Sequence, residues 1–339
     1  MTARPGAAAE VTASIGPERS ARVSLEPPSG RQHREPPSGR QHRLVHGDQE
    51  AVVTEVGATL RTYLVGGRPA ILGFDEGQLA THARGQLLMP WPGRVGDGRY
   101  RWGEVDHQLP LDEPEFGNAI HGLARWVNWV SVAHSDGRLG MRHRLHPRDG
   151  YPFCLDLVAT FGLEETGLEV TLAATNLGDG PAPFGAGAHA YLTVGAAAID
   201  GWRLRLPAET VLHADRRMLP GARGPVQGTE LDFRVARPIG PTRLDTAFTD
   251  LVRDPDGCVR VTLESSDGRR LVLWADRGFP WLLLYSADGL LPGERRRGLA
   301  VEPMTCPPDA LRSGEDVITL QPGETTTARW GIDVTGFRD

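Results

Sequence analysis

The sequence predicts an all-β protein built as one large antiparallel β-sandwich, and three observations favour this class. Apolar residues alternate with polar ones at a period of two in many short segments, which is the pattern of half-buried strands. The chain contains 42 glycines and 27 prolines among 339 residues, a composition typical of many turns and few long helices. No segment offers three helical turns of apolar i, i+3, i+4 spacing, so an α/β fold with alternating helices is disfavoured.

The N-terminal part of the chain differs in composition from the rest. Residues 26–43 read EPPSGRQHREPPSGRQHR, a nine-residue unit written twice. Two copies are too few for a solenoid, and a unit with no apolar residue except proline cannot bury a stacking face. We therefore expect residues 1–43 to form a disordered tail with a duplicated segment, and residues 44–339 to form a single domain. A basic binding arm is the functional alternative for the tail.

Strand patterns recur along the domain. The segments 168–172, 202–206 and 259–263 place an apolar side chain at every second position, which predicts half-buried strands. The runs LVLWA (271–275) and WLLLY (281–285) are apolar throughout, which predicts strands buried on both faces. Turn sequences such as NLGDGPAP, RDPDGC and SSDGRR separate the strands at short intervals.

Composition narrows the classes of function. The formal net charge is -6, and no long basic run appears outside the tail, so we expect no nucleic-acid partner. All 37 basic residues are arginines. The absence of lysine excludes a lysine Schiff base and a phosphate-binding loop that ends in Gly-Lys-Ser/Thr. The expected partner is a small molecule.

Location and cofactors are predicted from what the sequence lacks. The three cysteines are widely spaced with no C-x-x-C pair, which fits a reducing cytoplasm. No apolar run has the length of a secretory segment or a membrane span, so we expect a soluble, cytoplasmic protein without a membrane partner. The closest-spaced histidine pair, in HRLH (143–146), has no acidic or cysteine partner at ligand spacing. We therefore expect neither a metal nor a cofactor, and we interpret Cys306 as a buried thiol.

Five stretches place an ionisable group among small residues near strand ends or turns, an arrangement that lets a polar ligand approach backbone and side chain together. They are PWPGRVGDGRY (90–100), GNAIHGLARW (117–126), FGAGAHAYLTVG (184–195), RLDTAFTDL (243–251) and VEPMTCPPDAL (301–311). Taken singly, each group has an ordinary structural explanation: a core histidine for His189, a turn histidine for His121 and a solvated hairpin arginine for Arg94.

Glu302 is the least ordinary of these groups. It ends an apolar run and is flanked by Val301 and Pro303. A carboxylate in that place must be paired, hydrogen-bonded or protonated to avoid a desolvation cost of several kcal/mol. A salt bridge with an arginine is the structural alternative to a catalytic role.

Considered together and in this order, HGLAR (121–125), HAY (189–191), LDTAFTDL (244–251) and VEPMTCPPDAL resemble the aldose 1-epimerase, or galactose mutarotase, family. The resemblance runs from about Arg43 to the end of the chain. It implies a β-sandwich of the galactose mutarotase type with a sugar pocket on one sheet, and an enzyme that interconverts the α and β anomers of a free aldose.

The resemblance also implies roles for individual residues. Glu302 is similar to the general base of the family and His189 to its general acid. Arg94 and His121 are similar to its sugar-oxygen ligands, Tyr191 to a pocket wall, and Asp245 to the ligand of a hydroxyl pair. The chemistry needs such a set, because a hemiacetal opens when a base takes the C1 hydroxyl proton while an acid protonates the ring oxygen.

The sequence departs from the family pattern in three places. Gly93 precedes Arg94 where asparagine is frequent, Leu283 stands where a sugar-binding glutamine is expected, and Ala190 replaces the proline of His-Pro-Tyr. Losing two polar ligands is expected to change which hydroxyls are recognised without removing the acid-base pair.

Three other functions remain open from the sequence. A glycoside hydrolase or lyase would use a carboxylate pair such as Asp245 and Glu302. A non-catalytic sugar-binding protein could keep the same fold. A phosphosugar 1-epimerase would need extra arginines at the pocket, for which Arg84, Arg125 and 295–297 are the candidates.

Overall fold

The structure of the protein is a computed structural model, and it describes residues 35–195 and 197–337. The first strand, β1 (Gln41–His46), begins before residue 44, so the domain starts earlier than predicted. Residues from Glu35 onward belong to one unit. The first copy of the repeat, 26–34, lies outside the described residues.

The second copy of the repeat, 35–43, is part of the domain rather than of a tail. The amide of Gly39 donates to the carbonyl of Pro36 and closes a turn. The last three residues of the copy then pair with β2, and His42 is buried opposite Val53. The prediction failed here because pairing with β2 and burial of a histidine depend on residues that follow the repeat.

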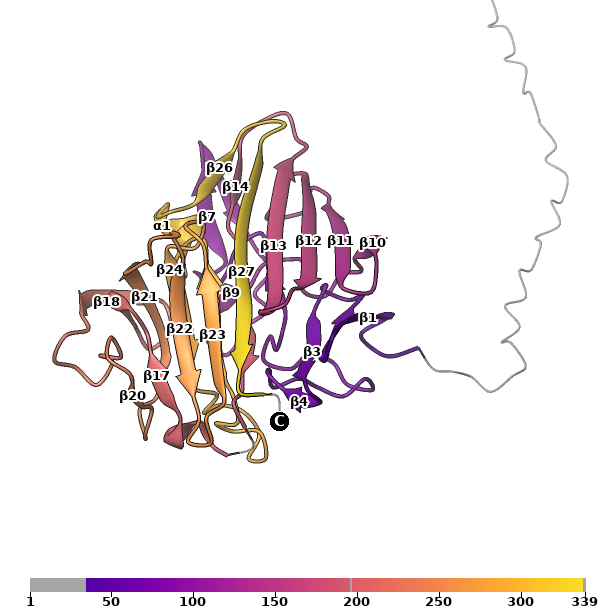
Figure 1. Ribbon diagram of the computed structural model, residues 1–339. Helices are drawn as coiled ribbons and strands as arrows, with labels where there is room; N and C mark the ends of the chain where they lie inside the picture. The colour runs from indigo at the N-terminus through magenta and orange to yellow at the C-terminus, as the bar shows by residue number, and fades with distance from the viewer. Residues whose placement is uncertain (1–34, 196, 338–339) are drawn as a thin grey trace, which may run out of the picture. The chain divides into compact units, whose positions relative to one another are not determined.

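The larger of the two main sheets has nine strands, and every neighbouring pair in it is antiparallel. Figure 1 shows β27 between β13 and β23, so the end of the chain completes the middle of this sheet. In spatial order its strands are β10 (Val130–His134), β11 (Arg138–Leu145), β12 (Leu155–Leu163), β13 (Gly167–Asn176), β27 (Thr325–Thr335), β23 (Arg270–Ala275), β22 (Val259–Glu264), β17 (Arg203–Arg205) and β20 (Arg237–Pro238).

The second main sheet has eight strands and carries the candidate site. In spatial order its strands are β19 (Pro220–Pro225), β18 (Ala208–Ala214), β21 (Asp245–Leu251), β24 (Trp281–Tyr285), β25 (Leu299–Met304), β15 (Gly187–Ala188) and β5 (Leu87–Leu88), with β16 (Ala190–Leu192) also paired to β25.

Smaller sheets and short helices complete the described part of the chain. One sheet has four strands: β1, β2 (Gln49–Thr54), β3 (Leu60–Val65) and β4 (Arg68–Pro69). Three two-stranded sheets consist of β6 (Arg94–Gly96) with β9 (Asn118–Ile120), β7 (Arg99–Trp102) with β8 (Val105–Gln108), and β14 (Ala182–Phe184) with β26 (Ile318–Leu320). Within 35–195 and 197–337 the only helical segments are α1 (Ala310–Ser313) and the 3-10 turn η1 (Ile199–Gly201). No helix in this part of the chain has the length and apolar character that a membrane crossing requires.

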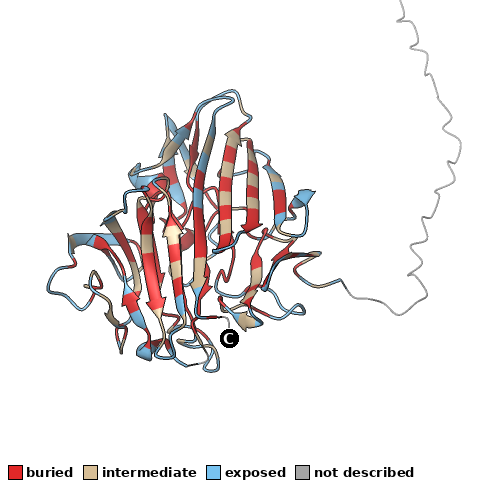
Figure 2. Ribbon diagram, viewed as in Figure 1, coloured by how far each residue is buried: buried red, intermediate tan, exposed pale blue. Residues whose placement is uncertain are grey.

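The predicted all-β antiparallel architecture is confirmed, and so are the alternating strands. β13 shows alternating buried and half-buried residues along its length (Figure 2). The run 281–285 forms β24, which is buried on both faces over its first four residues, as expected. The run 271–275 is different: Val272 and Trp274 in β23 are only half-buried, so this face of the nine-stranded sheet is partly open to solvent at these positions.

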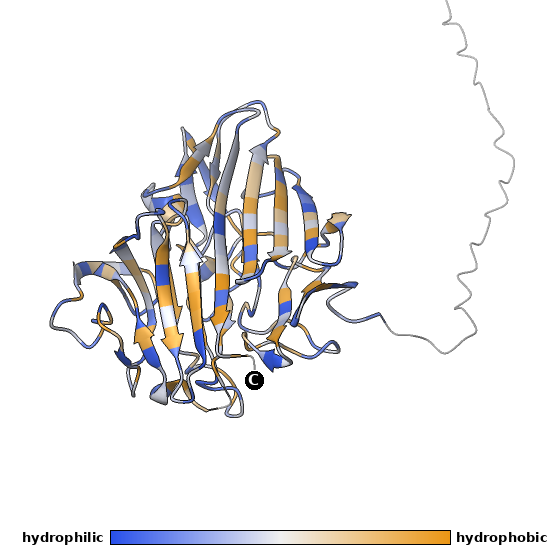
Figure 3. Ribbon diagram, in the orientation of Figure 1, coloured by the Kyte–Doolittle hydropathy of each residue, from blue (hydrophilic) through white to orange (hydrophobic). Residues whose placement is uncertain are grey.

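The two main sheets share one core. Val261 and Leu273 of the nine-stranded sheet belong to the same buried cluster as Leu284 and Val301 of the eight-stranded sheet. Figure 3 shows hydrophobic bands along the strands that contribute to this cluster. Burial of apolar side chains between two sheets is the main favourable contribution to the stability of a sandwich.

The eight-stranded sheet is buried on its second face as well, and this explains where a site can form. Because side chains alternate along a strand, Leu282 and Leu284 point into the shared core while Leu283 points to the opposite face. Leu283 lies in register with Glu302 on β25 and with Ala247 on β21. Polar groups on this second face lie on a rigid, paired scaffold.

Candidate active site

Glu302 lies inside β25 rather than at the end of the apolar run, since the strand continues through Pro303 to Met304. Its neighbour Val301 points into the shared core, so the alternation of the strand turns Glu302 to the second face of the eight-stranded sheet. Only 1% of its side chain is exposed. The strand tolerates Pro303. Any slip of the strand in register would move the Glu302 carboxylate.

His189 lies between β15 and β16, beside Glu302. Its backbone amide donates to the carbonyl of Gln86, and its own carbonyl accepts from the amide of Gly85. These bonds orient the imidazole so that Nε2 is 3.1 Å from Oε1 of Glu302. The partner of the carboxylate is therefore a histidine rather than the arginine of the structural alternative.

Both side chains line a cavity of about 530 Å³ on the second face of the sheet. Trp126, which is 51% exposed, lines the same cavity, so the cavity reaches the protein surface. Its volume lies within the range of small-molecule sites. A sugar could thus reach the acid-base pair from solvent.

Burial controls the protonation of the pair. Desolvation raises the pKa of Glu302 well above its ordinary value, and Asp245 raises it further. Desolvation also lowers the pKa of His189, to about 3. Both directions oppose charge, so burial favours the state in which the pair holds one proton between Oε1 and Nε2. Among the residues that the structure describes, Nδ1 of His189 and Oε2 of Glu302 have no hydrogen-bond partner, which leaves both atoms for a ligand.

His121 is held by the loop that precedes Arg94, not by its own loop. Nδ1 of His121 accepts a hydrogen bond from the amide of Gly93 at 3.1 Å, and the amide of His121 donates to the carbonyl of Gly93. Burial lowers the pKa of His121 well below its ordinary value, so the ring is neutral. Because Nδ1 is an acceptor, the proton sits on Nε2, and the ring is a hydrogen-bond donor in the cavity that it lines.

The backbone explains the glycine at position 93. Gly93 has φ +67, and a Cβ there would lie 3.0 Å from Cα of Pro308. The left-handed conformation favours glycine, with asparagine the usual alternative, and the approach of Pro308 leaves little room for a side chain. The departure from the family pattern thus fits this local geometry.

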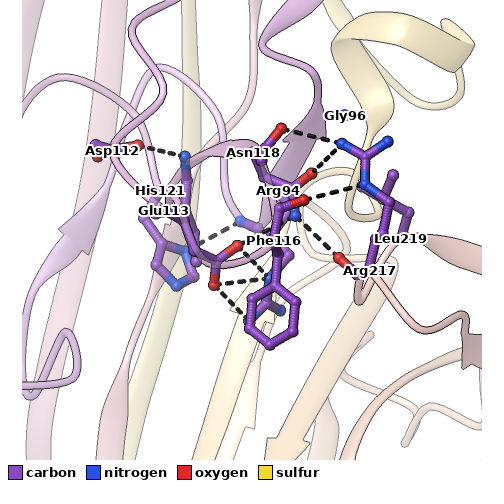
Figure 4. A network of polar contacts seen from close by, with 12 residues as sticks. Arg94, Gly96, Asp112, Glu113, Phe116, Asn118, His121, Arg217 and Leu219 are labelled. Carbon is purple, nitrogen blue, oxygen red and sulfur yellow. Dashed lines mark hydrogen bonds and ion pairs between the residues drawn. The ribbon is translucent and has the colours of Figure 1, made fainter.

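Arg94 lines the cavity from β6 and is ion-paired, not solvated. Its Nε lies 2.9 Å from Oε2 of Glu113, and its Nη2 lies 2.9 Å from Oε1 of the same residue. Both side chains are mostly buried, at 15% and 16% exposure. The guanidinium also lies over the ring of Phe116, 5.8 Å from its centroid. Figure 4 shows this pair beside the loop that carries both Glu113 and Phe116.

Tyr191 and Asp245 lie on the same face of the sheet as Glu302. Tyr191 stacks on the His189 ring with 5.0 Å between centroids, and its hydroxyl donates to the carbonyl of His82. Asp245 lies opposite Tyr285 at the start of β21. Burial raises the pKa of the Asp245 carboxyl, while nearby Arg94 opposes this shift.

The structure brings all six sequence-predicted residues to one cavity, although they come from five separate segments. Leu283 also lines the cavity, so an apolar side chain stands next to Glu302 where a glutamine was expected. Sequence reasoning did not single out several other lining residues, among them Glu113, Phe116, Trp126 and Tyr285. Trp126 directly follows the HGLAR motif, so its place could have been found from the sequence. Glu113 lies in an acidic stretch of the sequence, and the neighbouring residues give no sign that it pairs with Arg94.

The arginines considered for phosphate binding are either ion-paired or absent from the cavity lining. Arg84 forms an ion pair with Glu294 and does not line the cavity. Arg125 lines the cavity but is paired with Asp112. Residues 295–297 are absent from the lining. Within the part of the chain that the structure describes, no three His, Cys, Asp or Glu side chains are grouped to hold a metal ion.

Comparison with known proteins identifies the family of the chain. The family model for aldose 1-epimerase matches residues 40–333, and the chain belongs to this family. The chain is 32% identical over 289 residues to YihR, an uncharacterised protein of Escherichia coli K12, a match that covers 83% of this chain and 89% of YihR. It is 25% identical over 294 residues to YphB, a second uncharacterised protein of that organism, covering 86% of this chain and 97% of YphB.

Solved structures show the same fold. A GalM/aldose epimerase homologue from Caenorhabditis elegans superimposes with a TM-score of 0.78 at 18% identity, covering 87% of this chain and 98% of the other. Galactose 1-epimerase from Lactobacillus acidophilus gives a TM-score of 0.72 at 24% identity, covering 86% of this chain and 93% of the other. The predicted galactose mutarotase-type sandwich is confirmed.

Proposed function

We propose that the protein is an aldose 1-epimerase that interconverts the α and β anomers of a free, uncharged aldose by general acid-base catalysis. One observation carries the proposal: Nε2 of His189 lies 3.1 Å from Oε1 of Glu302 at a cavity of about 530 Å³. A base and an acid that share one proton are the groups that opening of a cyclic hemiacetal requires.

Ring opening moves two protons and breaks one bond. The Glu302 carboxylate takes the proton of the C1 hydroxyl, and the oxygen that remains forms the carbonyl of the aldehyde. The C1–O5 bond breaks, and its electron pair goes to O5, which takes a proton from His189. The products are the open-chain aldose, protonated Glu302 and neutral His189.

Ring closure runs the same steps in reverse on the other face of the carbonyl. After rotation about the C1–C2 bond, the O5 hydroxyl attacks C1, and His189 takes its proton back. Glu302 returns its proton to the carbonyl oxygen. The anomer has changed, and both side chains have recovered their starting protonation.

The shifted pKa values are compatible with these roles. In the empty site, burial favours the proton on Glu302 and a neutral His189. Hydroxyl groups of a bound sugar can replace water at the unpartnered Oε2 and Nδ1, which lowers the cost of charge on either group. The proton needs to move only across the 3.1 Å contact to create the carboxylate and the imidazolium.

The remaining lining residues hold and orient the sugar. Arg94 and the Nε2–H of His121 donate hydrogen bonds to sugar oxygens and stabilise negative charge that develops on oxygen. Asp245 accepts hydrogen bonds from a pair of hydroxyls. Tyr191 forms a wall behind His189.

The charge of the cavity supports a neutral substrate. Each of the two arginines that line it, Arg94 and Arg125, is ion-paired with an acid. Four acidic side chains also line it: Glu113, Glu115, Asp245 and Glu302. A phosphate group would therefore meet carboxylates rather than an available arginine fork, so a phosphosugar is the less favoured substrate.

The test is NMR exchange between the α and β anomer signals of several free aldoses, with and without protein. We expect faster exchange with wild type, and a loss of about 100-fold to 10,000-fold in Glu302→Gln and in His189→Asn, since each removes one acid-base group. Glu104→Gln is the matched control, because Glu104 is almost fully exposed on the β7–β8 hairpin and does not line the cavity.

The alternatives predict different results. A sugar-binding protein without catalysis would bind aldoses but leave anomer exchange at the uncatalysed rate. A glycoside hydrolase would release reducing ends from a glycoside and would depend on Asp245 as well as Glu302. Either outcome would overturn the proposed mutarotation.

A further inference from the structure

We infer that Arg217, which does not line the cavity, is a positioning residue for Arg94. It holds the loop 113–118, whose Glu113 forms the ion pair with Arg94. The geometric part of this inference depends only on contacts within the chain. Its catalytic consequence rests on the proposed mutarotation.

Arg217 lies in a firmly closed turn between β18 and β19. Oδ1 of Asp215 accepts hydrogen bonds from the amides of Arg217 and Leu219, at 2.7 and 2.9 Å. The amide of Asp215 donates to the carbonyl of Leu219 at 2.8 Å. The turn therefore presents the Arg217 side chain from a fixed base, in a part of the chain about a hundred residues away from the loop.

The guanidinium donates to the backbone of the loop. Its Nε bonds to the carbonyl of Phe116 and its Nη2 to the carbonyl of Gly117, each at 3.0 Å. Nη2 also lies 2.8 Å from Oδ1 of Asp97, on the turn between β6 and β7. Figure 4 shows these hydrogen bonds between Arg217 and the loop.

Asn118 connects the same turn to the ion pair. Its Nδ2 donates to the backbone carbonyl of Arg217 at 2.9 Å and to Oε2 of Glu113 at 3.2 Å. Asn118 is fully buried, so these bonds are not exchanged for water. One amide group thus joins the Arg217 turn to the carboxylate that binds Arg94.

Apart from the contacts with Arg217, the backbone of the outer part of the loop is held by bonds within the loop itself: the amide of Phe116 donates to the carbonyl of Glu113, and the amide of Gly117 donates to the carbonyl of Pro114. The backbone groups of Glu113 and Asn118 bond to each other and close the loop at its base. Between them, Glu115 and Phe116 line the cavity. Without Arg217, the carbonyls of Phe116 and Gly117 lose these donors, and the outer part of the loop, which packs Phe116 against Arg94, is free to move.

The kinetic test compares Arg217→Met with Arg216→Met, a control from the same turn whose side chain is exposed. We expect Arg217→Met to lower kcat/KM about tenfold, because a displaced Arg94 binds the sugar oxygens and their developing negative charge less well. The control should match wild type in kinetics. Thermal unfolding of both variants should stay close to that of wild type, which separates positioning from a general loss of fold.

A double-mutant cycle then asks whether Arg217 acts through Arg94. If it does, Arg217→Met should have almost no further effect in an Arg94→Met background. Additive effects of the two substitutions would overturn the positioning role.

A second measurement does not need activity. The Nε–H of Arg94, bonded to Glu113, should give an arginine side-chain NMR signal that disappears in Arg94→Met. We expect that signal to shift or broaden in Arg217→Met and to be unchanged in Arg216→Met. If no aldose shows catalysed exchange with wild type, the proposed function fails. The NMR comparison still tests whether Arg217 positions Arg94. An unchanged Arg94 signal in Arg217→Met overturns the inference whether or not the protein is an epimerase.

Discussion

At the scale of single residues, Glu302 and His189 are two ionisable side chains that are both almost completely withdrawn from water. Each would be costly to bury alone as a charge. Together they can stay neutral overall with a single shared proton, and this state already contains one proton donor and one proton acceptor. The same burial that makes the pair expensive therefore prepares it for chemistry on a hemiacetal.

The pH dependence of the reaction follows from this arrangement. The singly protonated pair gains a second proton only as the pH approaches the lowered His189 pKa of about 3, and it loses its last proton only at the raised pKa of Glu302. We expect kcat/KM to be flat from slightly acid to neutral pH. Initial rates of anomer exchange over the pH range in which the protein stays folded measure this. A decline centred on the ordinary histidine value would contradict the assigned pKa directions.

At the scale of elements, the site depends on short connections that adopt unusual backbone conformations. Gly122, next to His121, has φ +75 and forms a parallel bridge with Met89. A Cβ on Gly122 would lie 2.1 Å from the carbonyl oxygen of Met89. The HGLAR segment can follow this path only because that residue is a glycine.

Substitution of Gly122 by alanine should therefore be strongly destabilising. Left-handed strain alone costs about 1–2 kcal/mol, and the clash with a backbone oxygen adds to it. The free energy of unfolding, measured by urea denaturation, should fall by more than about 2 kcal/mol. Gly180→Ala is the control, because Gly180 is exposed and a Cβ there meets nothing within 4 Å. Equal effects of the two substitutions would contradict this account of the turn.

Element predictions succeeded where local pattern decides structure. The alternating segments around 168–172 and 259–263 form β13 and β22 as expected, because their alternation of apolar and polar residues predicts half-buried strands. The apolar runs were ambiguous: β24 is covered on both faces but β23 fully on only one, since coverage depends on what the rest of the chain packs against each strand. The second copy of EPPSGRQHR likewise joins the four-stranded sheet because of its partners in the rest of the chain, not because of its own sequence.

At the scale of the whole molecule, the buried site affects stability. Glu302 keeps its proton to a higher pH in the folded protein than in the unfolded chain, where its ordinary value is 4.5. Above that value the unfolded state binds fewer protons than the native state at this position, so the contribution of Glu302 to stability falls as the pH rises. The decline continues up to the raised folded pKa.

Glu302→Gln removes this titration. We expect its free energy of unfolding, relative to wild type, to increase with pH by up to about 1.4 kcal/mol per unit above the ordinary glutamate value. Urea unfolding of both proteins at several pH values between mildly acid and neutral measures the difference. A difference that stays constant or falls with rising pH would show that the folded carboxyl is not held protonated by burial.

The sequence by itself determined the all-β class, several of the strands and, through the motifs that resemble the family, the six candidate residues of the site. These features depend on periodicity and on short contiguous motifs, which a linear chain displays directly. Only the tertiary structure decided that Glu113 binds Arg94 and that Arg217 contacts the loop 113–118. It also decided that Glu302 contacts His189 rather than an arginine. Such contacts join segments that are distant in sequence, and their energies depend on the register and burial that arise only when the sheets pack together.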